Sequence, residues 1–290
     1  MFHGAIVATV TPFRNGKLDA AGLKKLVEFQ IRNGTAGIVP CGTTGESATL
    51  SHDEHRQVID LVVEAVDGRV PVIAGTGSNN TSEAVALTRY AKKAGADAAL
   101  VITPYYNKPT QKGLVAHFTE VAGAADIPLV LYNVPGRTGV NMAAETVARL
   151  SEVGNIVGVK EASGNLAQIC DILSMTPRTF CVLSGDDGLY FPMLALGAKG
   201  VISVVSNVAP RLMADLYDAF SLGQVNRARE IHFRLWPLMQ ALFIETNPIP
   251  AKTALAMMGK VREEFRLPLC AMSDGNRKAL AKVLSGLKIL

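Results

Sequence analysis

Two residues in this sequence end apolar segments and could do carbonyl chemistry together. Lys160 closes the apolar run Ile156–Val159, and Tyr132 closes the run Pro128–Leu131. Burial at a strand end disfavours the charged ammonium of a lysine and favours the neutral amine, which attacks carbonyl carbon atoms. The pattern therefore predicts a Schiff base on Lys160, with the Tyr132 phenol passing protons beside it.

Three further segments could bind or serve a small acidic substrate. In the glycine-flanked turn 42–45, Thr43 and Thr44 can present hydroxyls and amides to a carboxylate. Arg137 follows Pro-Gly and offers a rigid fork for a second carboxylate. Tyr106 could complete a hydroxyl relay with Thr44 and Tyr132, and it could also pack at a subunit contact.

Each of these residues also has an ordinary structural interpretation. A strand-end lysine is commonly paired with a carboxylate, and a core tyrosine commonly satisfies its own hydroxyl. A glycine-flanked turn is often only a turn, and a loop arginine is often only solvated. Position alone leaves these alternatives open, so the prediction depends on whether the fold brings the residues together.

The elements that must position these residues alternate between short apolar runs and amphipathic helical stretches. About eight such repeats predict a parallel sheet covered by helices, closed as a (β/α)8 TIM barrel. The expected strands are Ala5–Val10, Ala36–Pro40, Val70–Ala74, Ala98–Ile102, Pro128–Tyr132, Ile156–Lys160, Thr179–Ser184 and Gly200–Val204. A doubly wound sheet is the alternative, but the segment after the first strand is not a glycine-rich phosphate loop.

Helix boundaries and domain organisation follow from the same pattern. Ser51 with Glu54 predicts a capping box, and the polar segment 79–82 predicts another helix start. Gly34, Gly95 and Gly197 stand where helices should end. Strand signals cease near residue 209, so we expect a catalytic barrel over residues 1–224. The C-terminal helical segment 225–290 should pack on the barrel or on a neighbouring subunit.

The composition argues against several other classes of protein. The 29 basic and 25 acidic residues are dispersed, so the net charge of +4 gives no basic patch for nucleic acid. The four cysteines lack metal-ligand spacing and are expected to be reduced and mostly buried. There is no signal-peptide pattern, and no apolar run reaches the ~18 residues of a membrane span. We therefore expect a cytoplasmic enzyme that uses no metal.

Three motifs resemble those of a known family: G-T-T-G-E at 42–46, Y-N-V-P-G-R-T-G at 132–139 and G-V-K-E-A-S-G at 158–164. Together with G-D-D at 185–187 and G-V-I-S at 200–203, they make nearly the whole chain similar to the dihydrodipicolinate synthase family. This family lies within the pyruvate-dependent class I aldolases of the N-acetylneuraminate lyase superfamily. The first and third motifs are shared by the superfamily. Arg137, in the second, distinguishes the synthases from the sialic acid lyases.

The resemblance implies a role for each residue. Lys160 forms an imine with pyruvate, Tyr132, Thr44 and Tyr106 form the proton relay, and Thr43 with Thr44 holds the pyruvate carboxylate. Arg137 holds the carboxylate of L-aspartate 4-semialdehyde. Gly185 and Ile202 line the pocket.

The reaction implied by the resemblance is condensation of these substrates to 4-hydroxy-tetrahydrodipicolinate, the first committed step of the diaminopimelate route to lysine, without a cofactor. In this family the tyrosine matching Tyr106 reaches into the neighbouring subunit's site. We therefore expect a homotetramer, arranged as a dimer of dimers.

A second likeness concerns feedback inhibition by lysine. The matching residues are Ser47, Ala48, His52, His55, Asn79, Glu83 and Tyr105. Glu83 could pair with the effector's ammonium while Asn79 and Tyr105 hold its carboxylate, and His52 and His55 would share one helical face. Solvated helix histidines and a capping asparagine are the ordinary alternative.

Two other functions stay open. The same chemistry serves an aldolase or lyase that cleaves a keto-deoxy sugar acid, although Arg137 argues against this substrate. A catalytically silent barrel could bind a pyruvate-like ligand as a sensor, because a fold alone does not prove turnover. The joint presence of Lys160, Tyr132, Thr44 and Tyr106 argues against the sensor.

Overall fold

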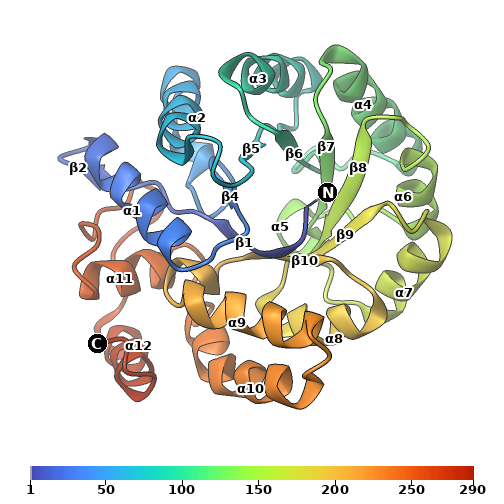
Figure 1. Ribbon diagram of the computed structural model, residues 1–290. Coiled ribbons are helices and arrows are strands. Elements are labelled where there is room, and N and C mark those ends of the chain that lie inside the picture. Colours follow the sequence, from blue (N-terminus) through green and yellow to red (C-terminus); the bar gives the residue numbers. More distant parts are fainter. Residues whose placement is uncertain (1) are drawn as a thin grey trace.

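The computed structural model describes residues 2–290 and contains eight parallel strands surrounded by helices (Figure 1). The strands are β1 (Gly4–Ala8), β4 (Gly37–Val39), β5 (Ile73–Gly75), β6 (Ala98–Ile102), β7 (Leu129–Asn133), β8 (Ile156–Glu161), β9 (Cys181–Ser184) and β10 (Gly200–Ser203). Their hydrogen-bonded order is β4-β1-β10-β9-β8-β7-β6-β5, and a bridge between Ile38 and Val72 links the two ends. The predicted TIM barrel is confirmed: each expected strand is present, Ala98–Ile102 with both of its expected ends and the others with one or both ends shifted.

One small element was not expected. The strands β2 (Phe13–Arg14) and β3 (Lys17–Leu18) form an antiparallel hairpin after β1. Asn15 and Gly16 join them with φ of 54° and 76°. Positive φ at both central residues is the signature of a type I′ turn, for which Asn-Gly is the preferred sequence. The dipeptide was therefore a readable signal for this hairpin.

The helices cover the outside of the barrel and then continue beyond it. They are α1 (Ala20–Arg32), α2 (His52–Val66), α3 (Thr81–Ala94), α4 (Gln111–Ala124), α5 (Pro135–Thr138), α6 (Ala144–Leu150), α7 (Leu166–Met175), α8 (Tyr190–Leu196), α9 (Pro210–Ser221), α10 (Val225–Ala241), α11 (Ile249–Met257) and α12 (Asp274–Gly286). Short 3-10 turns occur at η1 (Ser47–Thr49), η2 (Asp187–Leu189) and η3 (Val205–Asn207).

The predicted helix ends are largely correct. The capping box of α2 forms as expected, with Ser51 and Glu54 each bonding the other's main-chain N–H. Asn80, and not Asn79, caps α3 by accepting a hydrogen bond from the Ser82 N–H. Gly95 and Gly197 end their helices in the left-handed conformation, which glycine adopts without a Cβ penalty.

Apolar side chains fill the barrel interior beneath the carboxyl ends of the strands. This inner core contains Ile6, Ala8, Val39, Ile73, Ala98, Leu100, Val130, Tyr132, Val134, Cys181, Leu183 and Ile202. Along β7, Leu129 and Leu131 instead join the outer core between strands and helices. The period of two along a strand therefore sends Tyr132 inward.

The C-terminal helices share a core with the barrel. Residues of β1 and β10 pack in one apolar cluster with residues of α9, α10, α11 and α12. Figure 1 shows α9 and α10 side by side, with α12 close to α10 and α11. The cysteines divide evenly, since Cys41 and Cys181 are buried while Cys170 and Cys270 are exposed. The expectation that most of them are buried was therefore wrong.

Candidate active site

The register of two neighbouring strands brings Lys160 and Tyr132 together. They are direct partners in the ladder between β7 and β8, and each is 7% exposed. Lys160 Nζ lies 4.1 Å from the centroid of the Tyr132 ring. Lys160 is also paired with Leu183 of β9, so ladders on both sides fix its backbone. The Lys160 amine therefore lies over the Tyr132 ring, and within residues 2–290 neither side chain makes a hydrogen bond or ion pair that places it.

The carboxylate next to Lys160 in sequence points away from it. Glu161 is buried and accepts hydrogen bonds from Asn133 Nδ2 at 3.0 and 3.2 Å and from the Ser163 N–H at 2.7 Å. Burial raises the pKa of Glu161 because the charged form loses its hydration. Among residues 2–290, Lys160 forms no ion pair, so the ordinary pairing of a strand-end lysine with a carboxylate is not what places it here.

A cavity of about 400 Å³ opens at the carboxyl ends of the strands, where a TIM barrel carries its active site. Six of the predicted site residues line it: Thr43, Thr44, Tyr132, Arg137, Lys160 and Gly185. Residues of the C-terminal segment line it too: Trp236, Met239, Gln240, Phe243 and Asn247. The cavity is therefore built jointly by the strand ends and by α10 with the turn that follows it.

The threonine loop, defined as residues 42–46, is held by bonds from distant parts of the chain. Thr11 donates to the Gly45 carbonyl at 2.7 Å, and Asn247 Nδ2 donates to Thr44 Oγ1 at 3.0 Å. Because the Thr44 oxygen accepts this bond, its hydroxyl proton remains available to a group in the cavity. Thr44 can therefore pass a proton toward the space beside Tyr132.

Arg137 lies at the rim, on the one-turn helix α5. Its Nη2 donates to the main-chain carbonyl of Asn247 at 3.2 Å, and the residue is otherwise exposed. Asn247 thus contacts both Arg137 and Thr44, which line the same cavity. The remaining donors of the guanidinium fork can bind a carboxylate at the mouth.

Among residues 2–290, two buried oxygen atoms of cavity-lining residues have no hydrogen-bond partner. One carboxylate oxygen of Asp187 accepts from the Val204 and Val205 N–H groups at 3.0 Å, while its Oδ1 has none. The Oδ1 of Asn247 is likewise unpartnered. Burial raises the pKa of Asp187 to about 6. No sequence motif singled out Asn247, although it lines the cavity and bonds Thr44.

Gly185 is required by the space around the lysine. A Cβ at this position would lie 2.6 Å from the Ala162 Cβ and 3.1 Å from Lys160 Cε. The glycine therefore leaves room for the Lys160 side chain and for whatever binds to it.

Two predicted site residues do not line the cavity. Ile202 is fully buried in the inner core, below the lining. Tyr106 is 89% exposed with φ of 69°, and within one chain it contacts neither Thr44 nor Tyr132. The described chain therefore assembles three of the four predicted catalytic residues.

The residues expected to bind a lysine effector are only partly brought together. His52 and Glu83 line a surface hollow of about 260 Å³ with Arg56 and Ser82. His55 does not reach that surface, because it is buried with its Nε2 2.7 Å from the Gly75 carbonyl. Burial also lowers the pKa of His55.

The other four residues of this predicted site do not line that hollow. Ser47 and Ala48 lie in η1, while Asn79 and Tyr105 lie in loops.

Among residues 2–290, no group of three or more His, Cys, Asp or Glu side chains is arranged to hold a metal ion. No helix in the same range is long and apolar enough to cross a membrane.

Comparison with known proteins agrees with this geometry. The profile of the Dihydrodipicolinate synthetase family matches residues 1–287. A 4-hydroxy-tetrahydrodipicolinate synthase from Geobacter sulfurreducens is 58% identical over 290 residues, covering 100% of both chains.

Solved structures of the same kind superpose over the full chain. A dihydrodipicolinate synthase from Cyanidioschyzon merolae with lysine bound is 43% identical, with a TM-score of 0.97 and coverage of 100% of this chain and 99% of the other. A monomeric dihydrodipicolinate synthase variant is 45% identical, with a TM-score of 0.98 and coverage of 100% and 98%.

Proposed function

The chain belongs to the dihydrodipicolinate synthetase family, and from this premise we propose that it condenses pyruvate with L-aspartate 4-semialdehyde. The product is 4-hydroxy-tetrahydrodipicolinate, formed without a cofactor at the start of the diaminopimelate route to lysine. The observation that carries the proposal is the pairing of Lys160 with Tyr132 at the floor of a cavity that also presents Thr44 and Arg137.

Lys160 begins the reaction by attacking the keto carbon of pyruvate. The carbinolamine loses water to give an imine, and the proton transfers run through Tyr132 and Thr44, whose hydroxyl keeps a free proton. The threonine loop holds the pyruvate carboxylate through the hydroxyls and amides of Thr43 and Thr44. The imine makes the pyruvate methyl group acidic, so that loss of a proton gives an enamine.

The enamine then forms the new carbon–carbon bond with the aldehyde. Arg137 holds the carboxylate of the semialdehyde at the mouth, which brings the aldehyde carbon to the enamine. The amino group of the semialdehyde next attacks the imine carbon, closes the ring and releases Lys160. One water molecule is lost for each product formed.

Trapping on the lysine tests the chemistry directly. Borohydride added with pyruvate should reduce the imine and leave a covalent adduct on Lys160, located by mass spectrometry of peptides. An unmodified Lys160 under these conditions contradicts the proposal. Turnover assays with pyruvate plus semialdehyde, run beside cleavage assays with keto-deoxy sugar acids, separate the synthase from an aldolase and from a silent sensor.

We also propose that lysine is an effector of this enzyme. The hollow lined by His52 and Glu83 supports this, because the Glu83 carboxylate can receive an ammonium. Ser47, Ala48, His55, Asn79 and Tyr105 are the other residues that we assign to this site. Activity in millimolar-range lysine should fall in the unmodified chain and fall less in Glu83→Gln. Equal inhibition of both contradicts this site.

A homotetramer is the assembly we propose. An aromatic side chain as exposed as that of Tyr106, held away from its own barrel, suits a partner subunit's site. Sedimentation should give the mass of four chains. A fully active monomer contradicts a shared relay. We further propose a cytoplasmic location and treat residues 1–224 as the catalytic barrel, with the C-terminal helical segment 225–290 packed on it.

A further inference from the structure

A buried ion pair lies directly behind the threonine loop. The ammonium of Lys252, on α11, contacts a carboxylate oxygen of Glu46, and both side chains are 0% exposed. The same ammonium donates to the Glu264 carbonyl at 2.9 Å and lies 4.1 Å from the centroid of the Phe13 ring. The pair therefore joins the end of the threonine loop to two parts of the C-terminal segment.

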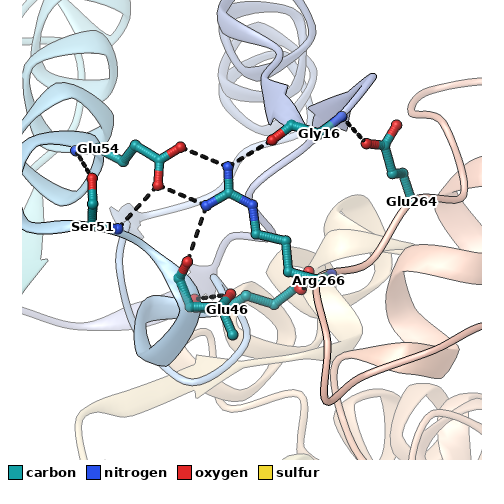
Figure 2. A network of polar contacts seen from close by, with 7 residues as sticks. Gly16, Glu46, Ser51, Glu54, Glu264 and Arg266 are labelled. Atoms are coloured by element: carbon teal, nitrogen blue, oxygen red, sulfur yellow. Dashed lines mark hydrogen bonds and ion pairs between the residues drawn. The ribbon is translucent and has the colours of Figure 1, made fainter.

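Arg266 also donates a hydrogen bond to the Glu46 carboxylate. Its main-chain N–H donates to Glu46 Oε2 at 3.3 Å, while its guanidinium binds both oxygens of Glu54 at 2.6 Å. It also donates to the carbonyls of Thr49 and Gly16. Figure 2 shows Arg266 reaching from the C-terminal segment toward Glu54 at the start of α2 and toward Gly16 in the hairpin. One part of the C-terminal segment thus fixes several neighbours of the loop.

Stability alone does not explain this pair. Desolvation lowers the pKa of Lys252, and only part of that loss is offset by Glu46. Glu46 also has φ of 54°, a left-handed conformation that glycine would adopt with less strain. Buried ion pairs can often be replaced by apolar residues without loss of stability. The orientation that the pair imposes is therefore the better reason for its presence.

The hydrogen bonds of the threonine loop indicate that the group oriented by the ion pair is the Thr44 hydroxyl. Thr44 lies two residues before Glu46, and its hydroxyl is fixed by Asn247, which precedes α11 and Lys252. We propose that Lys252 and Glu46 are positioning residues, which hold the threonine loop so that the Thr44 hydroxyl is aligned for proton transfer at Lys160. This inference rests on the proposed function, because it requires the catalytic role of Thr44.

The test removes both charges together. Glu46→Gln with Lys252→Met leaves no unpaired charge, so the double variant should fold with a melting temperature close to that of the unmodified chain. Its kcat should fall about tenfold or more, with KM for pyruvate changed less than about threefold. Unchanged kcat in the folded double variant overturns the proposal, because the pair would then be only structural.

A third substitution shows whether the effect runs through Thr44. In a Thr44→Val background, the same double substitution should reduce kcat by less than about twofold, because the group that it positions is already absent. An undiminished loss in that background overturns the proposal. The borohydride adduct on Lys160 of the unmodified chain is measured alongside, so that failure of the proposed function is recognised separately.

A milder variant keeps the proposal testable if the double variant does not fold. Arg266 is only partly buried, and Arg266→Met should lower kcat about two- to fivefold by loosening the outer ties of the loop. The matched control is Arg277→Met, which breaks an ion pair with Glu263 inside the same C-terminal segment. Its kcat should not change. Equal kcat in both variants contradicts the proposal.

Discussion

The Tyr132–Lys160 pair and the threonine loop face the same cavity but are held there by different means. Strand ladders on both sides of β8 place Lys160, and in the described part of the chain no side-chain hydrogen bond assists them. The loop, by contrast, depends on side chains from distant parts of the chain, which bond Gly45, Thr44 and Glu46. Ladder-held residues should therefore keep their places when side chains change, whereas the loop should not.

The largest effect should come from removing the Tyr132 hydroxyl, in the pair that the strand ladders hold. Tyr132→Phe keeps the ring and the register but deletes the proton-transferring hydroxyl, so kcat should fall about 10²- to 10³-fold. The melting temperature should hardly move, because the ladder and not the hydroxyl places the residue. Steady-state kinetics and thermal melts check both parts.

Tyr90→Phe is the matched control for this change. It deletes a tyrosine hydroxyl that bonds Asp60 outside the cavity, so activity should be retained. A large loss of melting temperature in Tyr132→Phe would contradict the view that the ladder alone places the pair.

The next effect tests the space around the ladder-held lysine. Gly185→Ala would place a methyl group 3.1 Å from Lys160 Cε and 2.6 Å from the Ala162 Cβ. We expect kcat/KM for pyruvate to fall about 10- to 100-fold, with about 1–3 kcal/mol of stability lost to overpacking. Gly154→Ala, where an added Cβ meets no atom within 4 Å, is the control. Full activity in Gly185→Ala would show that the space is not needed.

The same division explains what could be predicted from the sequence. The strands, the α2 capping box and the residues at strand ends follow from patterns among residues a few positions apart in the sequence. These features were therefore predicted correctly. Tyr132 and Lys160 come from adjacent strands of a barrel, so their meeting follows once the fold is known.

Residues that reach the cavity from far along the chain carry no such pattern. Asn247 bonds Thr44 across 203 positions, and Lys252 contacts Glu46 across 206. Neither belongs to a motif of known chemistry, and only the packing of the C-terminal segment makes them neighbours of the loop. Ile202 is a related case: its inward direction was predictable, but whether it reaches the cavity lining depends on its depth in the barrel.

A smaller effect concerns Asp187, which neither a ladder nor the threonine loop holds. Its pKa is about 6 in the folded chain, above the value of 3.8 for a free side chain. The folded chain therefore binds a proton that the unfolded chain releases, and the free energy of unfolding falls as pH rises from 3.8 to 6. Above pH 6 the full destabilisation caused by the buried Asp187 carboxylate is present.

Asp187→Asn should remove this cost at neutral pH. The gain in unfolding free energy should be about 1–2 kcal/mol at pH 7.5 and should vanish below pH 3.8. Chemical denaturation at several pH values measures this gain. A gain that is equal at all pH values would contradict the assignment to Asp187.

The smallest effect should come from Glu54, at the outer end of the bonds that hold the threonine loop. Its pKa is about 2, lowered from 4.5 chiefly by the Arg266 guanidinium. The stabilisation is therefore fully present above pH 4.5 and is lost as pH falls through 2. Because the side chain is 27% exposed, solvent screens part of it, and Glu54→Gln should cost about 0.5–1.5 kcal/mol at pH 7.

At pH 3 the cost of Glu54→Gln should shrink to less than half of its value at pH 7, since the unfolded chain is then protonated at this residue while the folded chain still resists protonation. Glu64→Gln, which breaks an exposed pair with Lys24, should cost much less at either pH. The activity of Glu54→Gln should fall only slightly, because Lys252 still holds Glu46. A loss of kcat as large as that of the Glu46 and Lys252 double variant would place the control of the loop at Arg266 and Glu54 instead of at the buried pair.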